Sequence, residues 1–424
     1  MLSIELIRRD AESVKAGLRR RHEDTVVIDQ VLELDAARRR AVAEGDNLRA
    51  RRNDVSKQIS RMKEKPQELI EEMRQAGDRI KAIDDETRVL DQKLADIMLG
   101  IPNLPLPDVQ DGSSADDNVV VRSWGEVTKK PFPVVPHWDL GERLGIIDLE
   151  RGARISGARF FMLKGLGARL ERALIWWFLD VHTREHGYTE IYPPYLVKSD
   201  VLLATGNLPK FGDNLYHDAE EDLWLVPTAE APLTNMHRDE ILEAGDLPRN
   251  YTAYTPCFRK EKTAAGRDVR GIKRVHQFDK VEMYKYTTPE TSDQELERMV
   301  GDVEDLLKRL GLTYRVLKLC AGDIGFQSAR TYDLEVWAPG SGEWLEVSSC
   351  STCVDFQARR ANTRYRPKAG GRTEFLHTLN GSGLALPRIV IAILENYQQP
   401  DGSVVVPDVL RPYMGVDVIK AAGK

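Results

Sequence analysis

The sequence predicts an α+β protein, in which an N-terminal hairpin of two long helices precedes an antiparallel β-sheet with flanking helices. Three observations favour this fold class. Apolar residues recur at heptad spacing through residues 29–99, a proline-rich segment follows at 102–108, and beyond it several strand-like runs follow one another without an intervening helix. A chain of 424 residues is also too long for one ordinary core. We therefore expect a first domain at residues 1–108 and a second at 109–424.

The helical hairpin is predicted from two heptad patterns. The first is Leu34, Ala41, Leu48, Val55 and Met62, and the second is Leu69, Met73, Ala76, Ile80, Ile83, Thr87, Leu90, Leu94 and Ile97. A sustained heptad of apolar residues requires a partner helix that covers it. Pro66 lies between the two patterns, where a proline can end one helix and begin the next. The two halves are therefore expected to pair antiparallel.

The first helix of this hairpin is basic. Its cations include Arg38, Arg39, Arg49, Arg52, Lys57 and Arg61. One interpretation is a solvated coiled-coil face with ion pairs along the helix, or a rod used for dimerisation. The other is a positive strip that lies along a nucleic-acid backbone. The residues themselves are compatible with either.

Residues from about 119 onward predict the sheet and its helices. Helices are expected at 168–185, 289–310 and 384–397, and strands at 223–226, 251–259, 276–286, 313–319, 331–337 and 343–349. Strands that follow one another directly are typical of antiparallel pairing, whereas a doubly wound α/β fold alternates strands with helices. An antiparallel sheet with flanking helices is therefore favoured.

The overall composition narrows the possible classes of function. A net charge of −6 argues against a protein whose whole surface binds nucleic acid, although a local basic strip is compatible with it. The first ten residues contain no apolar signal region. No apolar window approaches the ~18 residues that a membrane span needs. We expect a cytoplasmic protein that does not bind membranes.

Cys350 and Cys353 form a lone CxxC motif. A structural zinc site requires four ligands, and the sequence has no second CxxC. We therefore expect two ordinary buried cysteines on a strand, and no zinc.

Residues 256–283 carry the strongest functional signal. A strand-like run ends at Arg259 and Glu261, a polar loop rich in Gly, Arg and Lys follows, and a second run carries Phe278 and Glu282. A guanidinium binds phosphate oxygens at two points, an aromatic ring stacks on a base, and a carboxylate binds an amine. The segment therefore predicts a nucleotide site on antiparallel β-structure, which differs from a P-loop or a Rossmann turn.

Thr228, Ala229 and Glu230 form a small polar cluster where a strand passes into a helix. Taken alone, this cluster is better explained as a helix N-cap, with Thr228 as the cap and Glu230 in the first turn. In residues 380–388, glycines that allow close backbone approach precede a buried helix, and Arg388 lies at its start.

The run 343–349 is a candidate metal segment. Strict alternation along a strand places Glu346 and Ser348 on one side and Val347 and Ser349 on the other. Carboxylate and hydroxyl oxygens near a triphosphate suit Mg²⁺, which is a hard cation that takes oxygen ligands.

Together these segments resemble the class II aminoacyl-tRNA synthetases, and most closely the seryl-tRNA synthetases of bacterial type. The resemblance covers nearly the whole chain. Residues 187–197 are similar to motif 1 of that class, 258–283 to motif 2 and 379–388 to motif 3, and residues 227–230, 355–360, 395–398 and the N-terminal hairpin are also similar to the family. The resemblance implies an antiparallel catalytic sheet of six to seven strands and a homodimer with Pro194 at its interface.

The resemblance also implies roles for individual residues. Arg259 and Arg388 are the expected catalytic residues: Arg259 would hold the α-phosphate of ATP, and Arg388 would reach the γ-phosphate. Glu261 would bind the adenine amino group, and the adenine would lie between Phe278 and Arg388. The remaining ATP-binding positions would be Lys260, Val275, Glu346, Val347, Ser348 and Ser349, of which Glu346 and Ser349 would take Mg²⁺. The serine-binding positions would be Thr228, Ala229, Glu230, Glu282 and Ser382.

The implied activity is that of a serine–tRNA ligase, which activates L-serine with ATP to seryl-adenylate and transfers serine to the 3′ end of tRNA-Ser. The basic arm would lie against the long variable arm of the tRNA, across the dimer, with tRNA-Sec as a second candidate substrate. One alternative is an enzyme that loads a carrier protein, and the basic arm counts against it. Another is an inactive paralogue that only binds tRNA, and the retained Arg259, Glu261, Glu282, Glu346 and Arg388 count against that.

Two positions depart from the family pattern. The motif 2 loop commonly reads Ser-Glu-Ala-Gly after its arginine, and here it reads Lys260-Glu261-Lys262-Thr263. Contacts of this loop with the tRNA acceptor end are therefore not carried over. Pro387 stands before Arg388, where many class II enzymes have glutamate. This leaves the role expected of the arginine unchanged.

Overall fold

The computed structural model describes residues 1–62, 66–262 and 270–421. The chain divides into two compact units, Met1–Pro102 and Asn103–Lys424. Thr263, where the motif 2 loop departs from the family pattern, lies outside the described residues. Within the described ranges, no helix combines the length and the apolar character that crossing a bilayer requires.

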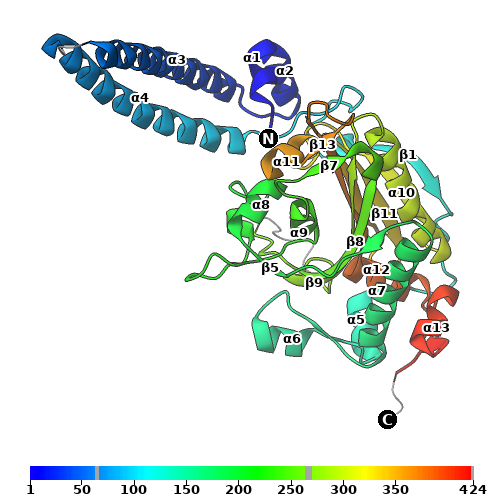
Figure 1. Ribbon diagram of the computed structural model, residues 1–424. Coiled ribbons are helices and arrows are strands. Elements are labelled where there is room, and N and C mark those ends of the chain that lie inside the picture. Colours follow the sequence, from blue (N-terminus) through cyan, green and yellow to red (C-terminus); the bar gives the residue numbers. More distant parts are fainter. Residues whose placement is uncertain (63–65, 263–269, 422–424) are drawn as a thin grey trace. The chain divides into compact units, whose positions relative to one another are not determined.

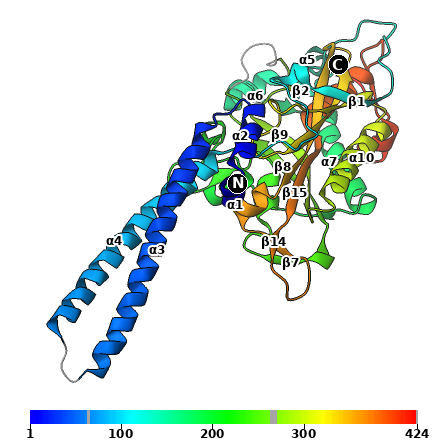
Figure 2. The same cartoon turned by 90° about the horizontal axis from the view of Figure 1, so that it is seen from above.

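The first unit is helical. Its described part consists of α1 (Ile4–Arg9), α2 (Ala11–Arg20), α3 (Val26–Arg61) and α4 (Gln67–Gly100). Side chains cap the two short helices, because Ser3 accepts a hydrogen bond from the backbone N–H of Leu6 and Asp10 accepts one from Ser13. The long helices α3 and α4 lie side by side and run antiparallel (Figures 1 and 2). The predicted helical arm is confirmed.

The hairpin is held together by apolar residues and by ion pairs between its helices. The buried heptad positions include Ala41, Val55, Ala76, Ile80 and Ile83. Gly45 allows close approach of the helices, because a Cβ atom at this position would lie 3.3 Å from Cγ2 of Ile83. Arg79 of α4 donates to both carboxylate oxygens of Glu44 on α3, at 2.7 and 2.9 Å. The two helices therefore cover each other, as the heptads predict.

The second unit is built on a sheet of eight strands among the described residues, in the order β1-β10-β11-β12-β15-β9-β8-β4. The strands are β1 (Val119–Trp124), β4 (Thr189–Glu190), β8 (Arg249–Phe258), β9 (Gln277–Thr287), β10 (Tyr314–Lys318), β11 (Arg330–Ala338), β12 (Glu343–Val354) and β15 (His377–Ala385). Neighbouring strands are antiparallel except β4 and β8, which are parallel. The predicted fold class is confirmed.

The sheet differs from the expectation in its extent. It has eight strands where six to seven were expected, because β1 and the two-residue β4 extend its edges. It also contains β15 as a central strand, which includes the glycines of 380–383. These glycines do allow close approach, since a Cβ atom at Gly381 would lie 2.8 Å from Sδ of Met299 and 2.9 Å from Sγ of Cys350.

The remaining elements surround this sheet. The helices are α5 (His137–Arg143), α6 (Leu149–Ser156), α7 (Leu166–Arg184), α8 (Ser199–Thr205), α9 (Glu230–Asn235), α10 (Ser292–Arg309), α11 (Phe356–Ala361), α12 (Leu386–Asn396) and α13 (Arg411–Met414). Short strands pair as β2 (Ile147–Asp148) with β3 (Met162–Leu163), β5 (Leu196–Val197) with β6 (Trp224–Leu225), β16 (Val404–Val405) with β17 (Val418–Ile419), and β14 (Glu374–Phe375) with β13 (Arg364–Arg366) and β7 (Ile241–Glu243).

The two faces of the large sheet have different surroundings. The helices α7, α10 and α12, which were predicted at 168–185, 289–310 and 384–397, pack against one face and form the main apolar core with it (Figure 1). Alternate residues of β9 divide between the faces. Val281 and Met283 belong to this core, whereas Lys280 and Glu282 line a cavity on the opposite face.

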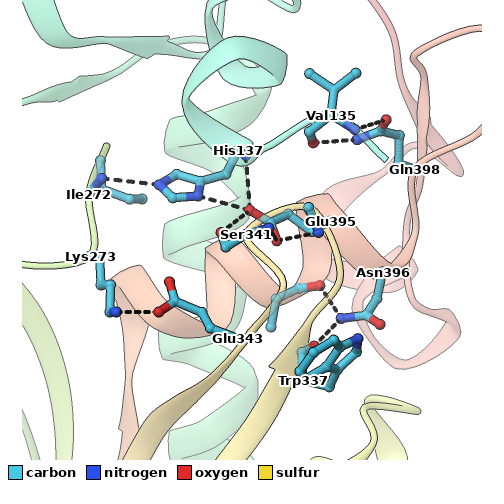
Figure 3. A network of polar contacts seen from close by, with 12 residues as sticks. Val135, His137, Ile272, Lys273, Trp337, Ser341, Glu343, Glu395, Asn396 and Gln398 are labelled. Carbon is cyan, nitrogen blue, oxygen red and sulfur yellow. Dashed lines mark hydrogen bonds and ion pairs between the residues drawn. The ribbon is translucent and has the colours of Figure 1, made fainter. Parts of the chain in front are cut away.

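A buried carboxylate on α12 joins four segments of the second unit (Figure 3). Glu395 is fully buried and accepts hydrogen bonds from the backbone N–H groups of His137, Gly340 and Ser341 at 2.9 to 3.0 Å. Nε2 of His137 accepts from the N–H of Ile272 at 3.2 Å. Nδ1 therefore carries the ring proton and donates it to Glu395, 3.0 Å away. The network fixes α12, the start of α5, residue 272 and the turn between β11 and β12 relative to one another.

The same network determines the ionisation of Glu395. Burial opposes ionisation, but hydrogen bonds from His137 and Ser341 hold the pKa of Glu395 below its usual range. Gly271 is required beside the imidazole, because its φ is +69° and a Cβ atom there would lie 2.0 Å from Nε2 of His137. The carboxylate is thus a structural anion whose donors are all in place.

Replacing Glu395 with glutamine is expected to destabilise the protein by about 3 kcal/mol at pH 7. The NH₂ group of the glutamine is a donor, and it would take the place of a carboxylate oxygen that accepts hydrogen bonds. The carboxylate stabilises the fold above the pKa of an unfolded glutamate, about 4.3, and this contribution is lost as the pH falls through the lower pKa of the folded state. The difference between wild type and E395Q should therefore shrink below pH of about 4. Denaturant unfolding at several pH values measures it.

The matched control is E150Q, at a carboxylate whose side chain is 80% exposed. It should leave the free energy of unfolding nearly unchanged. A destabilisation of E395Q that is independent of pH would contradict the role assigned to the ionised carboxylate.

Candidate active site

A cavity of about 590 Å³ lies on the sheet face opposite to α7, α10 and α12. Its walls include residues of β9, β10, β11, β12 and β15, residues that follow β8, the first residue of α9 and the start of α12. The predicted site residues that line it are Thr228, Glu230, Arg259, Glu261, Val275, Phe278, Glu282, Glu346, Val347, Ser349, Ser382 and Arg388. Segments that are far apart in the sequence therefore meet in one cavity.

One end of the cavity combines a guanidinium with an aromatic ring. Cζ of Arg259 lies 5.2 Å from the ring centroid of Phe278. Nε of Arg259 donates to the carbonyl of Pro227 at 3.2 Å, and its backbone N–H donates to the carbonyl of His276 at 2.9 Å. The pairing of β8 with β9, which sets Cys257 opposite Phe278, brings these groups together. A guanidinium beside an aromatic ring in a cavity wall suits a phosphate and a planar base.

Glu261 lies where the chain leaves β8. Its carbonyl accepts a hydrogen bond from Nη1 of Arg159 at 2.8 Å, and its carboxylate Oε2 lies 3.5 Å from Nη1 of Arg274. These contacts hold the carboxylate at the same end of the cavity as Arg259 and Phe278.

A β-bulge brings Glu346 and Ser349 to the same wall. The register between β11 and β12 shifts next to Leu334, so that Val347 is an additional residue in β12. Strict alternation had placed Glu346 and Ser349 on opposite sides of the strand. That expectation is wrong, because the bulge reverses the alternation beyond Val347, and both side chains line the cavity.

Arg388 lies in the first turn of α12 and contacts β12. Its Nη1 donates to the carbonyl of Glu346 at 2.6 Å and lies 3.3 Å from Oε2 of the same residue. Pro387 precedes it in the first turn of the helix, where the missing N–H costs nothing because it would have no helical partner. The departure from the family pattern at Pro387 therefore leaves Arg388 in the cavity.

The other end of the cavity contains two buried carboxylates. Glu282 is 1% exposed and Glu230 is 6% exposed. Thr228 donates to Oε2 of Glu282 at 3.0 Å, and Gln357 donates to Oε1 of Glu230 at 2.6 Å. Burial and the charge of Glu282 raise the pKa of Glu230 to about 7, although Lys280 opposes this rise. Two acids in one enclosed space suit a cationic ligand.

Three predicted site residues do not line the cavity. Nζ of Lys260 lies over the ring of Tyr216, 5.4 Å from its centroid, and Ala229 is buried in a separate apolar cluster. Ser348 points to the other side of β12 and donates to the carbonyl of Ser382 at 2.6 Å. Ser348 therefore holds the backbone of Ser382, which is a cavity residue, and does not line the cavity itself.

The sequence reasoning missed two acids on β11. Asp333 and Glu335 line the cavity together with Thr331. The alternation of polar and apolar residues along the strand could have revealed them. Leu334, between the two acids, is fully buried on the core side, so both acids lie on the opposite face. Burial and the charge of Glu346 raise the pKa of Asp333 well above its usual range. Its Oδ1 has no hydrogen-bond partner among the described residues.

These oxygen donors fit a hard cation. Glu346, Ser349 and Asp333 line the same wall and supply the carboxylate and hydroxyl oxygens that Mg²⁺ takes. A cation there would offset the repulsion between the two carboxylates and give Oδ1 of Asp333 a partner. In the part of the chain that the structure describes, no group of three or more His, Cys, Asp or Glu side chains converges as a metal site. A cation held here would therefore take further oxygens from a ligand.

The cysteines of the CxxC motif are buried on β12 as free thiols. His182 of α7 and His186, two residues beyond the end of that helix, have the HxxxH spacing that is also found in zinc sites, and the sequence reasoning overlooked this pair. Nε2 of His182 contacts the carbonyl of Gly383 at 3.0 Å, and Nε2 of His186 contacts Asp305 at 3.0 Å. Burial lowers the pKa of His182 to about 3 and keeps its ring neutral. Both rings thus take part in packing between elements.

The basic residues of the arm fall into two groups. Arg38, Arg39 and Arg49 form ion pairs within the first unit, with Asp91, Asp35 and Asp84 respectively. Arg52, Lys57 and Arg61 are exposed and form no ion pair with another described residue. The interpretation as a paired coiled-coil face therefore describes the first group, and the second group retains free charge for another partner.

Comparison with known proteins extends to both units. Residues 213–397 match the family model described as tRNA synthetase class II core domain (G, H, P, S and T), and residues 1–105 match that of the seryl-tRNA synthetase N-terminal domain. The seryl-tRNA synthetase from Pyrococcus horikoshii complexed with ATP is 38% identical, with a TM-score of 0.95 and 100% of both chains covered. The cytoplasmic serine–tRNA ligase from Naegleria fowleri in complex with AMP is 32% identical, with a TM-score of 0.88 over 100% of this chain and 99% of that one. The fold and the cavity thus define a class II aminoacyl-tRNA synthetase.

The sequence relatives identify the family within this class. The serine–tRNA ligase of Thermomicrobium roseum is 58% identical over 98% of this chain and 94% of its own length. Those of Chloroflexus aurantiacus and Dehalococcoides mccartyi are 58% and 56% identical, over 98% and 99% of this chain and 98% and 100% of their own lengths. The chain belongs to the serine–tRNA ligase family, as its motifs predicted.

Proposed function

We propose that this protein is a serine–tRNA ligase that activates L-serine with ATP to seryl-adenylate and pyrophosphate, and then transfers serine to the 3′ end of tRNA-Ser. One observation carries the proposal: two buried carboxylates line the same cavity as a guanidinium, an aromatic ring and an acid–hydroxyl wall. In a member of this family, that arrangement supports adjacent sites for an amino acid and a nucleotide. Charging takes place where tRNA is, so a cytoplasmic location belongs to the same proposal.

The first step joins the serine carboxylate to the α-phosphorus of ATP. The carboxylate is already ionised at neutral pH and needs no general base. Its oxygen forms a bond to the α-phosphorus, the bond from that phosphorus to the bridging oxygen breaks, and pyrophosphate leaves with the electron pair. Catalysis then requires alignment of the reactants and neutralisation of the charge on the phosphate oxygens.

Arg259 supplies this neutralisation in the proposed mechanism, because a guanidinium binds phosphate oxygens at two points and stays protonated. Phe278 would stack on the adenine, Glu261 would accept from its amino group, and Arg388 would serve the far phosphates. Lys260 and Ser348 would act indirectly, which their contacts with Tyr216 and Ser382 support. Val275 and Val347 would line the nucleotide end.

Glu346 and Ser349 would hold Mg²⁺, with Asp333 beside them. The cation would neutralise phosphate charge when bound. The oxygen donors of this wall and the partnerless Oδ1 of Asp333 support this assignment.

The acidic end would bind serine. Glu230 and Glu282 would accept from its ammonium and hydroxyl groups, with Thr228 and Ser382 beside them, and Ala229 would contribute only its backbone because its side chain is in an apolar cluster. A site that hydrogen-bonds a hydroxyl rejects alanine strongly, since the polar groups of the protein would be left unpaired.

In the second step, the oxygen of a hydroxyl of the terminal tRNA ribose forms a bond to the carbonyl carbon of seryl-adenylate and loses its proton, while the bond from that carbon to the phosphate oxygen breaks and AMP leaves with the electron pair. The predicted domain at 109–424 would perform both steps, and the domain at 1–108 would bind the long variable arm of tRNA-Ser through its exposed cations. Arg52, Lys57 and Arg61 support this contact. A tRNA-Sec with a similar arm is the second candidate substrate.

A homodimer is proposed through the surface that includes Pro194. Pro194 is exposed, and the nearby Tyr192 and Leu196 are 82% and 51% exposed. Trp176 on α7 is 55% exposed and lines a second cavity of about 610 Å³, into which Glu171 contributes a buried Oε2 without a hydrogen-bond partner among the described residues. These exposed apolar groups and the unpaired carboxyl support burial against a second copy. A monomeric mass in light scattering would contradict the dimer.

ATP–pyrophosphate exchange with a panel of amino acids tests the activation step. Serine is expected to give the highest kcat/KM, with alanine about 10⁴-fold lower because it lacks the hydroxyl. R259A should abolish exchange while its thermal unfolding stays cooperative. Faster exchange with glycine, alanine or threonine than with serine would refute the assignment.

The raised pKa of Glu230 predicts a pH dependence for serine binding. Its carboxyl is neutral below pH of about 7 and ionised above it. Since the ammonium of serine binds the ionised form, the KM for serine should be about tenfold higher at pH 6 than at pH 8, while the KM for ATP changes little. In E230Q the KM should be high at both pH values. A similar tenfold change in E230Q would assign the titration to another group.

Removing the exposed cations of the arm is expected to impair tRNA charging and to leave serine activation unchanged. R52A/K57A/R61A should lower kcat/KM for aminoacylation of tRNA-Ser by about tenfold or more and weaken its salt dependence, because three phosphate contacts are lost. Exchange should be unchanged. The control R74A/R88A/K93A removes three exposed charges from α4. An equal loss of charging in both variants would contradict a specific strip on α3.

A further inference from the structure

Lys280 is a buried lysine in the cavity wall to which the predicted roles assign no function. It is 6% exposed and lies on β9, two residues before Glu282, so both side chains point to the cavity face. Its ammonium donates to Oγ1 of Thr228 at 2.8 Å and forms an ion pair with Oε2 of Glu282. Burying an ammonium is costly unless it is paired. The lysine is therefore built into the acidic end of the cavity.

The contacts of Thr228 determine where its hydroxyl proton points. Oγ1 accepts from Lys280 and from the backbone N–H of Glu230, the latter at 3.2 Å. A hydroxyl group has one proton and two acceptor positions. The proton is therefore directed to Oε2 of Glu282, 3.0 Å away. Because lysine and threonine both engage Oε2, the other oxygen of Glu282 is the one available to a ligand.

Lys280 also changes the charge that this end of the cavity presents. Without it, Glu230 and Glu282 would place two negative charges in one enclosed space, and one of them would take up a proton. A protonated carboxyl donates a hydrogen bond where the ammonium and hydroxyl of serine need acceptors. With one ammonium among two carboxylates, both can remain acceptors and the remaining negative charge matches the single cation of the ligand.

We propose that Lys280 is a positioning residue for the amino-acid substrate: its ammonium orients Glu282 and Thr228 and supplies the counter-charge that lets two carboxylates bind one substrate together. This inference rests on the proposed function, because it concerns the amino-acid half of that same site. The polar contacts of Lys280 are with Thr228 and Glu282 and not with Arg259 or Phe278. Its effect should therefore fall on serine and not on ATP.

The test compares two buried lysines on the same strand. Lys285 is 2% exposed and pairs with Glu295 at 2.9 Å, but it points to the helical face and does not line the cavity. In ATP–pyrophosphate exchange, K280M should raise the KM for serine at least tenfold and leave the KM for ATP within twofold. K285M should change neither KM, although it also breaks a buried ion pair. K280R, which keeps the charge, should recover part of the affinity for serine.

A double-mutant cycle with E282Q shows whether Lys280 acts through Glu282. If it does, K280M/E282Q has the same KM for serine as E282Q alone. The double variant leaves neither buried charge unpaired, so it remains measurable even where K280M does not fold. Additive effects, an unchanged KM for serine in K280M, or equal changes for serine and ATP would overturn the proposal.

Exchange measured with the wild-type protein distinguishes a failure of this proposal from a failure of the proposed function. If wild type exchanges with serine and K280M behaves like wild type, only the role of Lys280 fails. If wild type exchanges fastest with another amino acid, the assignment to serine fails. The same cycle is then run with that amino acid, whose ammonium must meet the same two carboxylates.

Discussion

Repulsion among the carboxylates that line the cavity is the constraint on which its arrangement depends. Glu230, Glu282, Asp333, Glu335 and Glu346 all line it, and ionised acids in one enclosed space disfavour one another. Cations of the protein offset most of this repulsion: Lys280 pairs with Glu282, Arg315 with Glu335, and Arg388 with Glu346. Among the described residues no cation pairs with Asp333, and the raised pKa of its carboxyl reflects both its burial and the charge of Glu346. A cationic ligand near an acid that no protein cation neutralises would therefore reduce the remaining repulsion.

The placement of these acids depends on the backbone as much as on residue type. The bulge at Val347 turns Ser349 toward the cavity, and a second register shift in β15, after Ser382, lies beside Glu282 on β9. Outside the cavity, Glu395 binds the turn that precedes β12 and, through His137, the backbone of residue 272, which is followed by the lining residues 273–275. One buried carboxylate therefore steadies two walls of the site from behind.

Patterns of apolar and polar residues were enough to predict the fold class, the helical arm and the three helices of the core face, and the family resemblance supplied a minority of the residues that line the cavity. They failed where geometry depends on partners from elsewhere in the chain. Strict alternation separated Glu346 from Ser349 because a bulge exists only relative to the neighbouring strand. The glycines of β15 suggested close approach but not a central strand, since strand residues are seldom glycine. Lys280 was not singled out, because its partners, Thr228 and Glu282, meet only in the folded sheet.

The contacts within the cavity imply different behaviour of its nucleotide and amino-acid ends. Arg388 donates to Glu346 and Arg259 lies over Phe278, so a nucleotide must replace these contacts with its phosphates and base. A phosphate that takes the place of the Glu346 carboxylate keeps the guanidinium of Arg388 paired, because both partners are anions. At the acidic end, Lys280 and Thr228 occupy only one oxygen of Glu282. An amino acid can therefore add to that end without displacing the groups that orient it. On the proposed function, adjustment on binding is confined to the nucleotide end, and the amino-acid end is already organised.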